Sequence, residues 1–281
     1  MSAARTAGAT TRAPDEATMQ VRGIRLRADP AREPCFSVVH LYSQLWRSAD
    51  LSRESQREKL HREYNTEVQG MEIAALSLVE YPDAPWELRM EIARQCWDES
   101  RHARLYHRRL LEKNGHKGEF PIANHEWTVT CSFPTLVQRL AIQNRTFESG
   151  SMDSMNKAVK MWNSIGDTET ARMMDAILAD EVQHVRFANQ WIRSLGRQDG
   201  TVMLQVAQAV SQLKRMSAAL RPQPGETSIN GIDLVGTPEP SVKANIEDRA
   251  HADFSDDEID MVVVRQQQEA RDRPPFDGGN R

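Results

Sequence analysis

Two short segments of the chain repeat one arrangement of acidic residues and histidine: Asp98-Glu99-Ser100-Arg101-His102 and Asp180-Glu181-Val182-Gln183-His184. Both read D-E-x-x-H, and their corresponding residues are 82 positions apart (181 − 99). Because residues three apart on an α-helix share a face, each segment can direct one carboxylate and one imidazole toward the same point. Imidazole nitrogens and carboxylate oxygens are ligands of transition-metal ions, so the repeat predicts a metal site.

A third E-x-x-H segment, Glu58-Lys59-Leu60-His61, shows by contrast what distinguishes the other two. It follows Arg57 rather than an acidic residue, and it has no copy at the 82-residue spacing. We therefore interpret it as the solvent-exposed face of a helix, which is the usual setting of charged residues.

The remaining ligands of a two-metal site follow from the symmetry of the repeat. Bundles that hold two iron or manganese ions combine two Glu-x-x-His helices with two further helices that each carry one glutamate. Glu148 precedes Glu181 by 33 residues (181 − 148), and Glu67 precedes Glu99 by 32 residues (99 − 67). Four buried carboxylates would repel one another strongly unless cations neutralised them. The predicted metal ligands are Glu67, Glu99, His102, Glu148, Glu181 and His184.

Glu72 is the alternative to Glu67 as the ligand from the first of these helices. The two residues are five positions apart, so on a helix they point about 140° away from each other and cannot both face one ion. Only Glu67 has the spacing that the symmetry requires. We expect Glu72 to line the cavity or to pair with an arginine.

Three further residues are candidates for a catalytic role. Asp98 and Asp180 directly precede the glutamates of the two motifs. A metal-bound histidine commonly donates its other ring N–H to a carboxylate, so we expect each aspartate to accept from the histidine of the opposite motif. A surface position for both aspartates is the alternative. Tyr106 lies one turn beyond His102, where its phenol could react with or hydrogen-bond to an oxygen species, or could simply pack in the core.

The elements that must position these residues are predicted to be helical. Long stretches rich in Glu, Gln, Leu and Ala are separated by breaks such as Tyr81-Pro82-Asp83-Ala84-Pro85 and Asn114-Gly115. No strand pattern of comparable strength occurs. Helices are predicted over residues 52–80, 85–113, 134–164, 167–195 and 201–220, with a short helix over 256–268. The predicted fold class is all-α, with a four-helix bundle that carries the ligands and an additional C-terminal helix.

Composition divides the chain into three parts. Residues 1–20 are rich in Ala, Thr and Arg and are expected to form a disordered N-terminal arm. Residues 21–220 are expected to form the helical bundle domain, and residues 221–281 a polar C-terminal extension with many Pro and Gly. For the extension, a mobile tail and a segment that folds over the bundle are equally open alternatives.

The composition also disfavours several classes of protein. The net charge of −4 gives no general attraction to nucleic acid or to an anionic membrane. Cys35, Cys96 and Cys131 lack C-x-x-C spacing, which fits a reduced cytoplasm and argues against a disulfide framework. No apolar run reaches the roughly 18–20 residues that span a bilayer, and the N-terminus lacks the apolar segment of a signal peptide. We therefore expect a cytoplasmic protein without a membrane partner.

The ligand segments resemble those of the ferritin-like superfamily of carboxylate-bridged di-iron proteins, over about residues 52–195. The D-E-x-R-H form of the first motif is similar to that of bacterial multicomponent monooxygenases, although the second motif has Gln183 in place of the arginine. The spacing of Glu99, His102 and Tyr106 resembles that of the ribonucleotide reductase radical subunit. The whole set is most similar to a poorly characterised bacterial ferritin-like family related to tRNA-hydroxylating di-iron monooxygenases. The segments that carry this last resemblance are Glu67-Val68-Gln69-Gly70-Met71-Glu72, Phe147-Glu148, and the two D-E-x-x-H motifs with Tyr106 and Arg109-Leu110.

The resemblance implies a ferritin-like four-helix bundle that binds two iron ions, or one iron and one manganese. We expect such a protein to activate O2 and to hydroxylate, N-oxygenate or desaturate a small organic substrate, with electrons from an external donor. Iron handling as a ferroxidase and hydroxylation of tRNA are the alternatives, although the acidic net charge argues against a nucleic-acid partner. A homodimer is compatible with this architecture, and the sequence does not identify the substrate.

Overall fold

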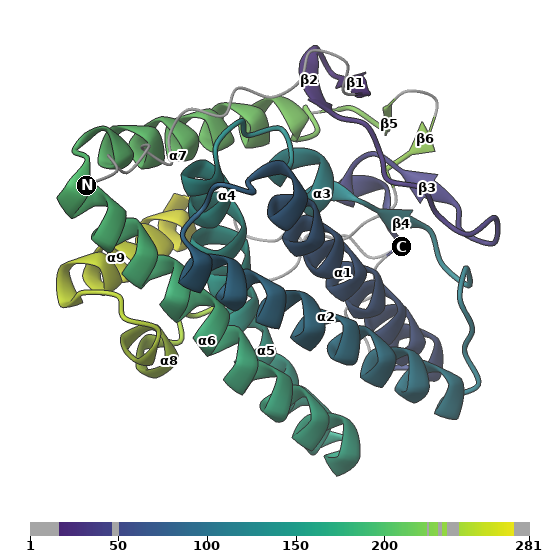
Figure 1. Ribbon diagram of the computed structural model, residues 1–281. Helices are drawn as coiled ribbons and strands as arrows, with labels where there is room; N and C mark the ends of the chain where they lie inside the picture. The colour runs from purple at the N-terminus through teal and green to yellow at the C-terminus, as the bar shows by residue number, and fades with distance from the viewer. Residues whose placement is uncertain (1–16, 47–50, 224, 230–231, 235–241, 273–281) are drawn as a thin grey trace.

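The structure is a computed structural model, and it describes residues 17–46, 51–223, 225–229, 232–234 and 242–272 (Figure 1). Its central elements are α1 (Arg53–Glu80), α2 (Trp86–Glu112), α5 (Ser149–Ser164) and α6 (Thr168–Gln198). Helix α1 packs along α2, and α5 packs along α6, so two helical hairpins form the body of the molecule. The prediction of a mainly helical, all-α protein is confirmed.

The starts of α1, α2 and α6 lie where the local sequence predicts them, whereas α6 continues through Gly196 to Gln198, beyond its predicted end at residue 195. The Ser52 side chain accepts a hydrogen bond from the Ser55 backbone N–H at the start of α1. Asp167 accepts one from the Thr170 backbone N–H at the start of α6, and Pro85 directly precedes α2. Capping side chains and proline act within one turn of the chain, so these boundaries do not depend on the rest of the fold.

The segment predicted as a single helix over residues 134–164 is interrupted. It consists of α4 (Leu136–Ile142), a π-helical segment η2 (Gln143–Glu148) and α5. At the interruption the Thr146 hydroxyl donates to the Ala141 backbone carbonyl at 2.8 Å, in competition with regular helical pairing. The prediction of one regular helix is therefore wrong, and the wider turn of η2 shifts the register of the side chains that follow it.

The N-terminal part of the described chain is a β-hairpin. Strand β1 (Thr18–Val21) pairs with β2 (Ile24–Arg27), and the Val21 and Leu26 side chains are buried in an apolar cluster with Phe133. This corrects the expected disordered arm at residues 18–20, because the two apolar side chains of the hairpin join the core. Residues 1–16 lie outside the described residues.

Further short elements lie outside the long helices. Strand β3 (Val38–Val39) pairs in parallel with β4 (Ile122–Ala123), a 3₁₀ turn η1 covers Tyr42–Gln44, and helix α3 covers His125–Thr130. Strand β4 and helix α3 lie between residues 113 and 134, where no helix or strand was predicted. Because the strands are only two residues long, the sequence carried no periodic pattern that could predict them.

The third E-x-x-H segment is buried rather than exposed, which corrects its interpretation. Glu58 is 3% exposed and His61 is 1% exposed. The Gly118 backbone N–H donates to His61 Nε2 at 3.0 Å, and the Arg62 side chain pairs with Glu58 at 3.0 Å. The segment that covers this face of α1 is more than fifty residues away in the sequence, so local patterning could not show it.

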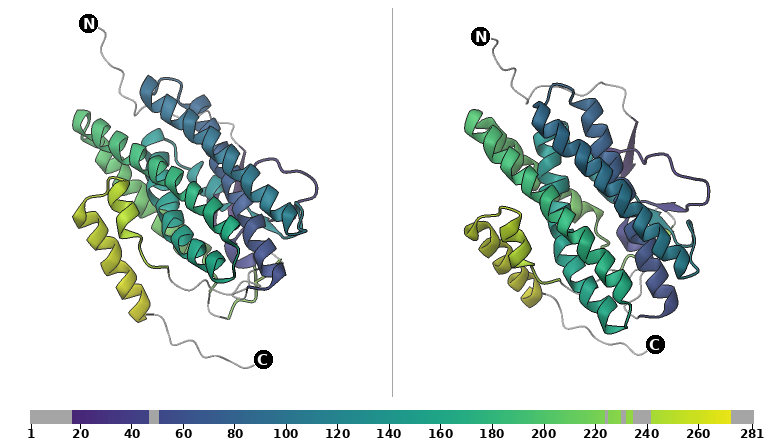
Figure 2. Two further views of the ribbon diagram at one scale, coloured as in Figure 1. Left: turned by 90° about the horizontal axis from the view of Figure 1, so that it is seen from below. Right: turned by 60° about the horizontal axis from the view of Figure 1, so that its bottom comes forward.

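The described C-terminal part begins with α7 and ends with helices that pack on the hairpins. The elements are α7 (Thr201–Leu220), β5 (Ser228–Ile229), β6 (Ile232–Asp233), α8 (Ile246–His251) and α9 (Asp256–Asp272). Figure 2 shows α8 and α9 along one side of the long helices, away from α1 and α2. The buried Arg249 of α8 pairs with Asp153 of α5 at 2.7 Å, so this part of the extension folds over the helical body. Within the described ranges, no helix is long and apolar enough to cross a membrane.

Two apolar clusters lie at different levels along the long helices. One contains Leu88 and Ile92 from the first turns of α2, and the other contains Tyr106 and Leu110 from its last turns. The buried acidic and histidine residues of α2 lie between these two levels. The fold therefore places a group of ionisable side chains between two layers of apolar core.

Candidate metal centre

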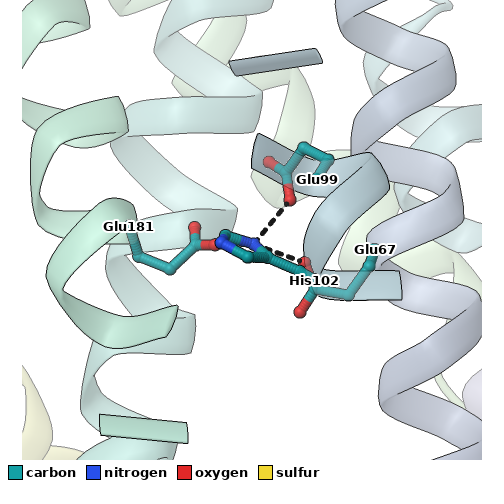
Figure 3. A group of neighbouring side chains, drawn as sticks. All are labelled: Glu67, Glu99, His102 and Glu181. Atoms are coloured by element: carbon teal, nitrogen blue, oxygen red, sulfur yellow. Dashed lines mark hydrogen bonds and ion pairs between the residues drawn. The ribbon is translucent and has the colours of Figure 1, made fainter. Parts of the chain in front are cut away.

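Six buried acidic and histidine side chains meet between the long helices. They fall into two overlapping groups, in each of which the candidate ligand atoms lie within 4.8 Å of one another. Figure 3 shows the side chains of the first group directed toward one another from three helices. The first group is Glu67, Glu99, His102 and Glu181, and the second is Glu99, Glu148, Glu181 and His184. The structure thus brings together all six residues that the sequence symmetry predicts as ligands, here called the carboxylate–histidine cluster.

Glu99 and Glu181 belong to both groups, and each divides its two oxygens between the two histidines. Glu99 Oε2 lies 3.4 Å from His102 Nδ1, and Glu99 Oε1 lies 3.5 Å from His184 Nδ1. Glu181 Oε1 lies 3.4 Å from His102 Nδ1, and Glu181 Oε2 lies 3.6 Å from His184 Nδ1. Each of these carboxylates therefore faces two separate positions, as a carboxylate that bridges two ions must do.

The distances in the cluster fit ions of the first transition row. An ion with bonds of about 2.1 Å holds neighbouring ligand atoms roughly 3.0–3.4 Å apart. The nitrogen–oxygen distances run from 3.2 Å, for His102 with Glu67, to 3.6 Å, for His184 with Glu181. His184 Nδ1 is also buried without a hydrogen-bond partner among the described residues, which is costly unless another group, such as an ion, satisfies it. The donor set and its spacing therefore fit two metal ions.

The outer ring nitrogen of each histidine faces an aspartate from the other motif. His102 Nε2 lies 3.2 Å from Asp180 Oδ2, and His184 Nε2 lies 3.4 Å from Asp98 Oδ2. Arg101 contacts both aspartates. The hydrogen bond with His184 is the main reason why the pKa of Asp98 lies well below its ordinary value. When each Nε2–H donates to an aspartate, each Nδ1 is left with a lone pair for a metal ion.

The cluster needs positive charge to hold its carboxylates together. Burial raises the pKa of Glu67 and of Glu148 well above the usual range. Burial alone would also raise the pKa of Glu181, but hydrogen bonds with His102 and His184 lower it to about 2. Against the effect of burial, the surrounding carboxylates raise the pKa of both imidazoles. Protons on the histidines supply the positive charge in the metal-free chain, and a metal ion that binds must displace protons.

Helix α1 favours Glu67 over Glu72 as the ligand. Glu72 forms a two-pronged ion pair with Arg32, at 2.7 Å and 2.8 Å, which is one of the two roles expected for it. Gly70 lies between Glu67 and Glu72 in the sequence. Because it has no side chain, the Glu99 carboxylate can pack against α1 at this position. A Cβ atom at Gly70 would lie 3.0 Å from Glu99 Cδ, so a larger residue would displace that carboxylate.

Two amide side chains that were not among the predicted site residues hold Glu148 in place. Gln95 donates to Glu148 and also to Glu99, the latter at 3.3 Å. Asn144 donates to the second Glu148 oxygen at 2.9 Å and to Gln95 at 3.0 Å. Gln95 lies one turn before Glu99 on the same face of α2, which is a usable sequence signal. Asn144 of η2 stands four residues before Glu148, which is the same spacing, and this spacing placed it close to Glu148 from the sequence.

A cavity leads from the cluster to the surface between α1 and α5. Apart from the ligand glutamates, its lining residues are Glu63, Thr66, Gly70, Glu126, Gln143, Ser151 and Met155. Glu63, Thr66 and Ser151 are partly exposed, which places the opening at their side chains. Glu126 of α3 is buried and accepts a hydrogen bond from Gln143 at 3.2 Å, and burial raises its pKa to about 8. Sequence reasoning missed Glu126 because only the tertiary fold brings α3 against η2.

Tyr106 lies in the core next to the cluster. It is 0% exposed and packs in the apolar cluster that contains Leu60 and Met152. Its hydroxyl has no hydrogen-bond partner within the described part of the chain. Burial, and then the negative charge of Glu67, raises the pKa of the phenol well above its usual value. Tyr106 is therefore a neutral phenol in a packing position, close enough to Glu67 to be affected by its charge.

Comparison with known protein families places the chain in one of them. A family model with the description "Protein of unknown function (DUF455)" matches residues 2–260, a range that includes the whole carboxylate–histidine cluster. No curated protein matches the chain, and no solved structure matches it.

Proposed function

This chain belongs to the DUF455 family of proteins of unknown function, and we propose that it is an oxidoreductase that uses two iron ions and O2 to oxidise a small organic substrate. We propose further that its long helices are a ferritin-like four-helix bundle. Di-iron proteins of that kind take one Glu from each of two helices and a Glu-x-x-His pair from each of two others. Glu67 and Glu148 correspond to the single glutamates, and the two D-E-x-x-H motifs correspond to the pairs.

The observation that carries this proposal is the division of the Glu99 and Glu181 oxygens between two histidines. A site for one ion would gather the donors around one point, whereas here each shared carboxylate faces two points. One ion could take His102 with Glu67, and the other could take His184 with the remaining glutamate of the cluster. Each would share the two central carboxylates.

A bound pair of Fe(II) ions supplies the electrons that reduce O2, and an external donor must then restore them. Imidazole and carboxylate donors without thiolate suit iron and manganese, which favours these ions over a structural zinc. In a hydroxylation, one oxygen atom of O2 enters the substrate and the other leaves as water. That balance requires two electrons, which the external donor delivers by way of the iron pair, and two protons for each substrate molecule.

The chain's own side chains orient the ligands and carry protons. Asp98 and Asp180 hold the histidine rings, and the amides of Gln95 and Asn144 hold Glu148. Glu126 lines the cavity, and with its pKa raised to about 8 by burial it keeps a proton at neutral pH. A protonated carboxyl group beside the reaction space is placed to act as a general acid.

Two cavities of different character reach this region. The cavity between α1 and α5 opens through the polar side chains of Glu63, Thr66 and Ser151, which suits a substrate that donates hydrogen bonds. A second cavity, on the far side of the Gln95 and Asn144 amides, is lined by five aliphatic side chains and five polar ones, the polar ones including Ser77, Arg139 and Gln143. These aliphatic residues are Ile73, Ala74, Ile92, Leu136 and Leu140. The aliphatic part of the second cavity suits O2, and the layers of core around the cluster limit the access of water.

Iron oxidation without an organic substrate is the second candidate function. Glu63 at the opening adds a carboxylate to the four glutamates of the cluster. Negatively charged groups along a passage attract cations such as iron and repel the phosphate groups of a nucleic acid. This favours iron handling over hydroxylation of tRNA as the second candidate.

Anaerobic loading with Fe(II), followed by a pulse of O2, tests the proposal. We expect two iron ions per chain and an optical change after O2 whose decay becomes faster when the organic substrate is present. Glu99→Ala and Glu181→Ala should lose both ions, because each carboxylate is shared, whereas the exposed Glu91→Ala should keep both. If the rate of iron oxidation does not change with any organic compound added, and an iron mineral forms, the result would favour the second candidate. A folded chain that binds neither iron nor manganese would refute both.

A further inference from the structure

Helix α2 presents a stripe of large apolar side chains to solvent. Trp86 is 66% exposed, Met90 is 51% exposed and Trp97 is 66% exposed. At 100° per residue these three side chains lie within an arc of about 40°. Among the large exposed hydrophobic residues of the described chain, only Trp86 and Trp97 are aromatic. Apolar groups concentrated in this way on a surface helix mark an interaction surface.

Two arginines continue the same stripe toward the C-terminal end of α2. Arg104 and Arg108 are exposed, and they fall within the same arc of about 40°. The five residues, at positions 86, 90, 97, 104 and 108, are separated by 4, 7, 7 and 4 positions. The stripe is therefore symmetric in spacing about Trp97, with apolar residues on one side and cationic residues on the other.

We propose that this stripe, made of Trp86, Met90, Trp97, Arg104 and Arg108, packs against the same stripe of a second copy of the chain in an antiparallel, twofold-symmetric dimer. Trp97 then lies at the twofold axis and meets its own counterpart. Each Arg108 guanidinium lies over the Trp86 ring of the other copy, and each Arg104 stem lies along Met90. A twofold interface uses the same patch on both subunits. This stripe allows it because, when two copies run antiparallel, the apolar half of each stripe lies opposite the arginine half of the other.

The acidic residues beside the stripe have the matching symmetry. Glu87 and Glu91 are exposed, next to the apolar half of the stripe. In the antiparallel arrangement they lie near Arg108 and Arg104 of the second copy, so opposite charges meet at both ends of the stripe. A different protein as partner would not require a stripe that is symmetric about one residue, and this favours a second copy of the chain.

The arginines are available for such contacts. Arg104 has no ion-pair partner among the residues that the structure describes. Arg108 pairs with Glu112 at 3.2 Å and Glu169 at 3.4 Å, and all three side chains are largely exposed. Exposed ion pairs stabilise a protein little, so their exchange for contacts across an interface has a small cost.

The proposed interface also lies over the aspartates that hold the histidines. Arg101 is on the same side of α2, its side chain is 37% exposed, and it pairs with Asp98 and Asp180. A second copy would cover Arg101 and remove water from these pairs, which strengthens them. The dimer does not depend on the metal, however, and it can be tested in the metal-free chain.

Sedimentation equilibrium of the full-length chain over a range of concentrations tests the dimer. We expect wild-type protein to be dimeric, and Trp97→Glu and Trp97→Arg to be monomeric when each is measured alone. Like charges that meet at the twofold axis should weaken association about 100-fold or more. An equimolar mixture of the two variants should dimerise again, because unlike charges then meet at the axis. Leu204→Glu, which changes a 58% exposed apolar residue of α7, is the matched control and should stay dimeric.

Three results would overturn the proposal. The first is wild-type protein that stays monomeric at all concentrations. The second is a Trp97→Glu variant that dimerises as wild type does, which would place any dimer contact on another surface. The third is a pair of monomeric variants that do not associate when mixed, because an axis at Trp97 requires their recovery. Restored association in the mixture also shows that both variants are folded.

Discussion

The crossed contacts between aspartates and histidines predict which ion each aspartate supports. Asp98 faces His184 and Asp180 faces His102, although each aspartate is closer in sequence to the other histidine. Asp98→Ala should therefore weaken the ion held with His184, and Asp180→Ala should weaken the ion held with His102. Without its carboxylate partner, each imidazole can rotate or take the wrong tautomer, so Nδ1 no longer points at the ion.

The structure also orders the two effects. Loss of such a partner typically lowers metal affinity about 10–100-fold, which is about 1.4–2.7 kcal/mol. The Asp98 side chain is 7% exposed, so water cannot easily replace it, and Asp98→Ala should lie near the upper limit. The Asp180 side chain is 21% exposed, so a water molecule can take over part of its role, and Asp180→Ala should lie near the lower limit. Asp→Asn at either position should have a smaller effect, because the amide oxygen still accepts the N–H.

The assay is an anaerobic titration of Fe(II) or Co(II) against a competing chelator, analysed for two dissociation constants. His102→Ala and His184→Ala identify which constant belongs to which ion. Asp175→Ala, which removes an exposed aspartate from α6, is the control and should bind as wild type does. The reasoning fails if Asp98→Ala weakens the same ion as His102→Ala, or if both aspartate variants keep wild-type affinity.

Three further predictions concern ligand choice, the C-terminal helices and pH. Glu67→Ala should reduce the metal content from two ions to one by elemental analysis, whereas Glu72→Ala should keep both because its carboxylate already pairs with an arginine. The reverse pattern would refute the symmetry argument. Asp153→Ala leaves the buried Arg249 without its carboxylate and should lower the free energy of unfolding by about 3–5 kcal/mol in urea. Asp153→Ala combined with Arg249→Met should recover part of this loss, and no recovery would contradict the explanation. Burial lowers the pKa of His61 to about 4, so the unfolded chain binds a proton at this residue between about pH 6.5 and pH 4 while the folded chain does not. As the pH is lowered from about 6.5 to about 4, the free energy of unfolding should fall by up to about 3 kcal/mol more in wild type than in His61→Gln. A difference in the free energy of unfolding between the two proteins that does not change with pH would exclude this cause.

The sequence predicted the starts of the long helices well because the interactions that set them are local. Ser52 and Asp167 cap helices through contacts three residues away, and a proline ends the turn before α2. The positions of Glu67 and Glu148 relative to the motifs were readable for a related reason. On regular helices that leave a common turn, equal numbers of residues reach equal heights, so symmetry in sequence becomes symmetry in space.

Features that depend on contacts between distant segments were not predicted. The burial of His61 requires the segment around Gly118, and the burial of Val21 and Leu26 requires the core beneath the N-terminal hairpin. For that reason the prediction that His61 lies on a solvent-exposed helix face was wrong. The π-helical turn before Glu148 likewise lies in a segment whose composition favours an ordinary helix.

The sequence alone determined the kind of chemistry that this protein can support. Four glutamates and two histidines at matched spacings specify a donor set, because the period of the α-helix converts spacing into direction. The tertiary structure decided how those donors are used: Glu99 and Glu181 each face two positions, while Asp98 and Asp180 cross to the opposite motif. It also decided that Glu126 reaches the same cavity. The reason is that helix periodicity sets the face on which a side chain lies, whereas only the packing of one helix against another sets which atoms meet across the gap.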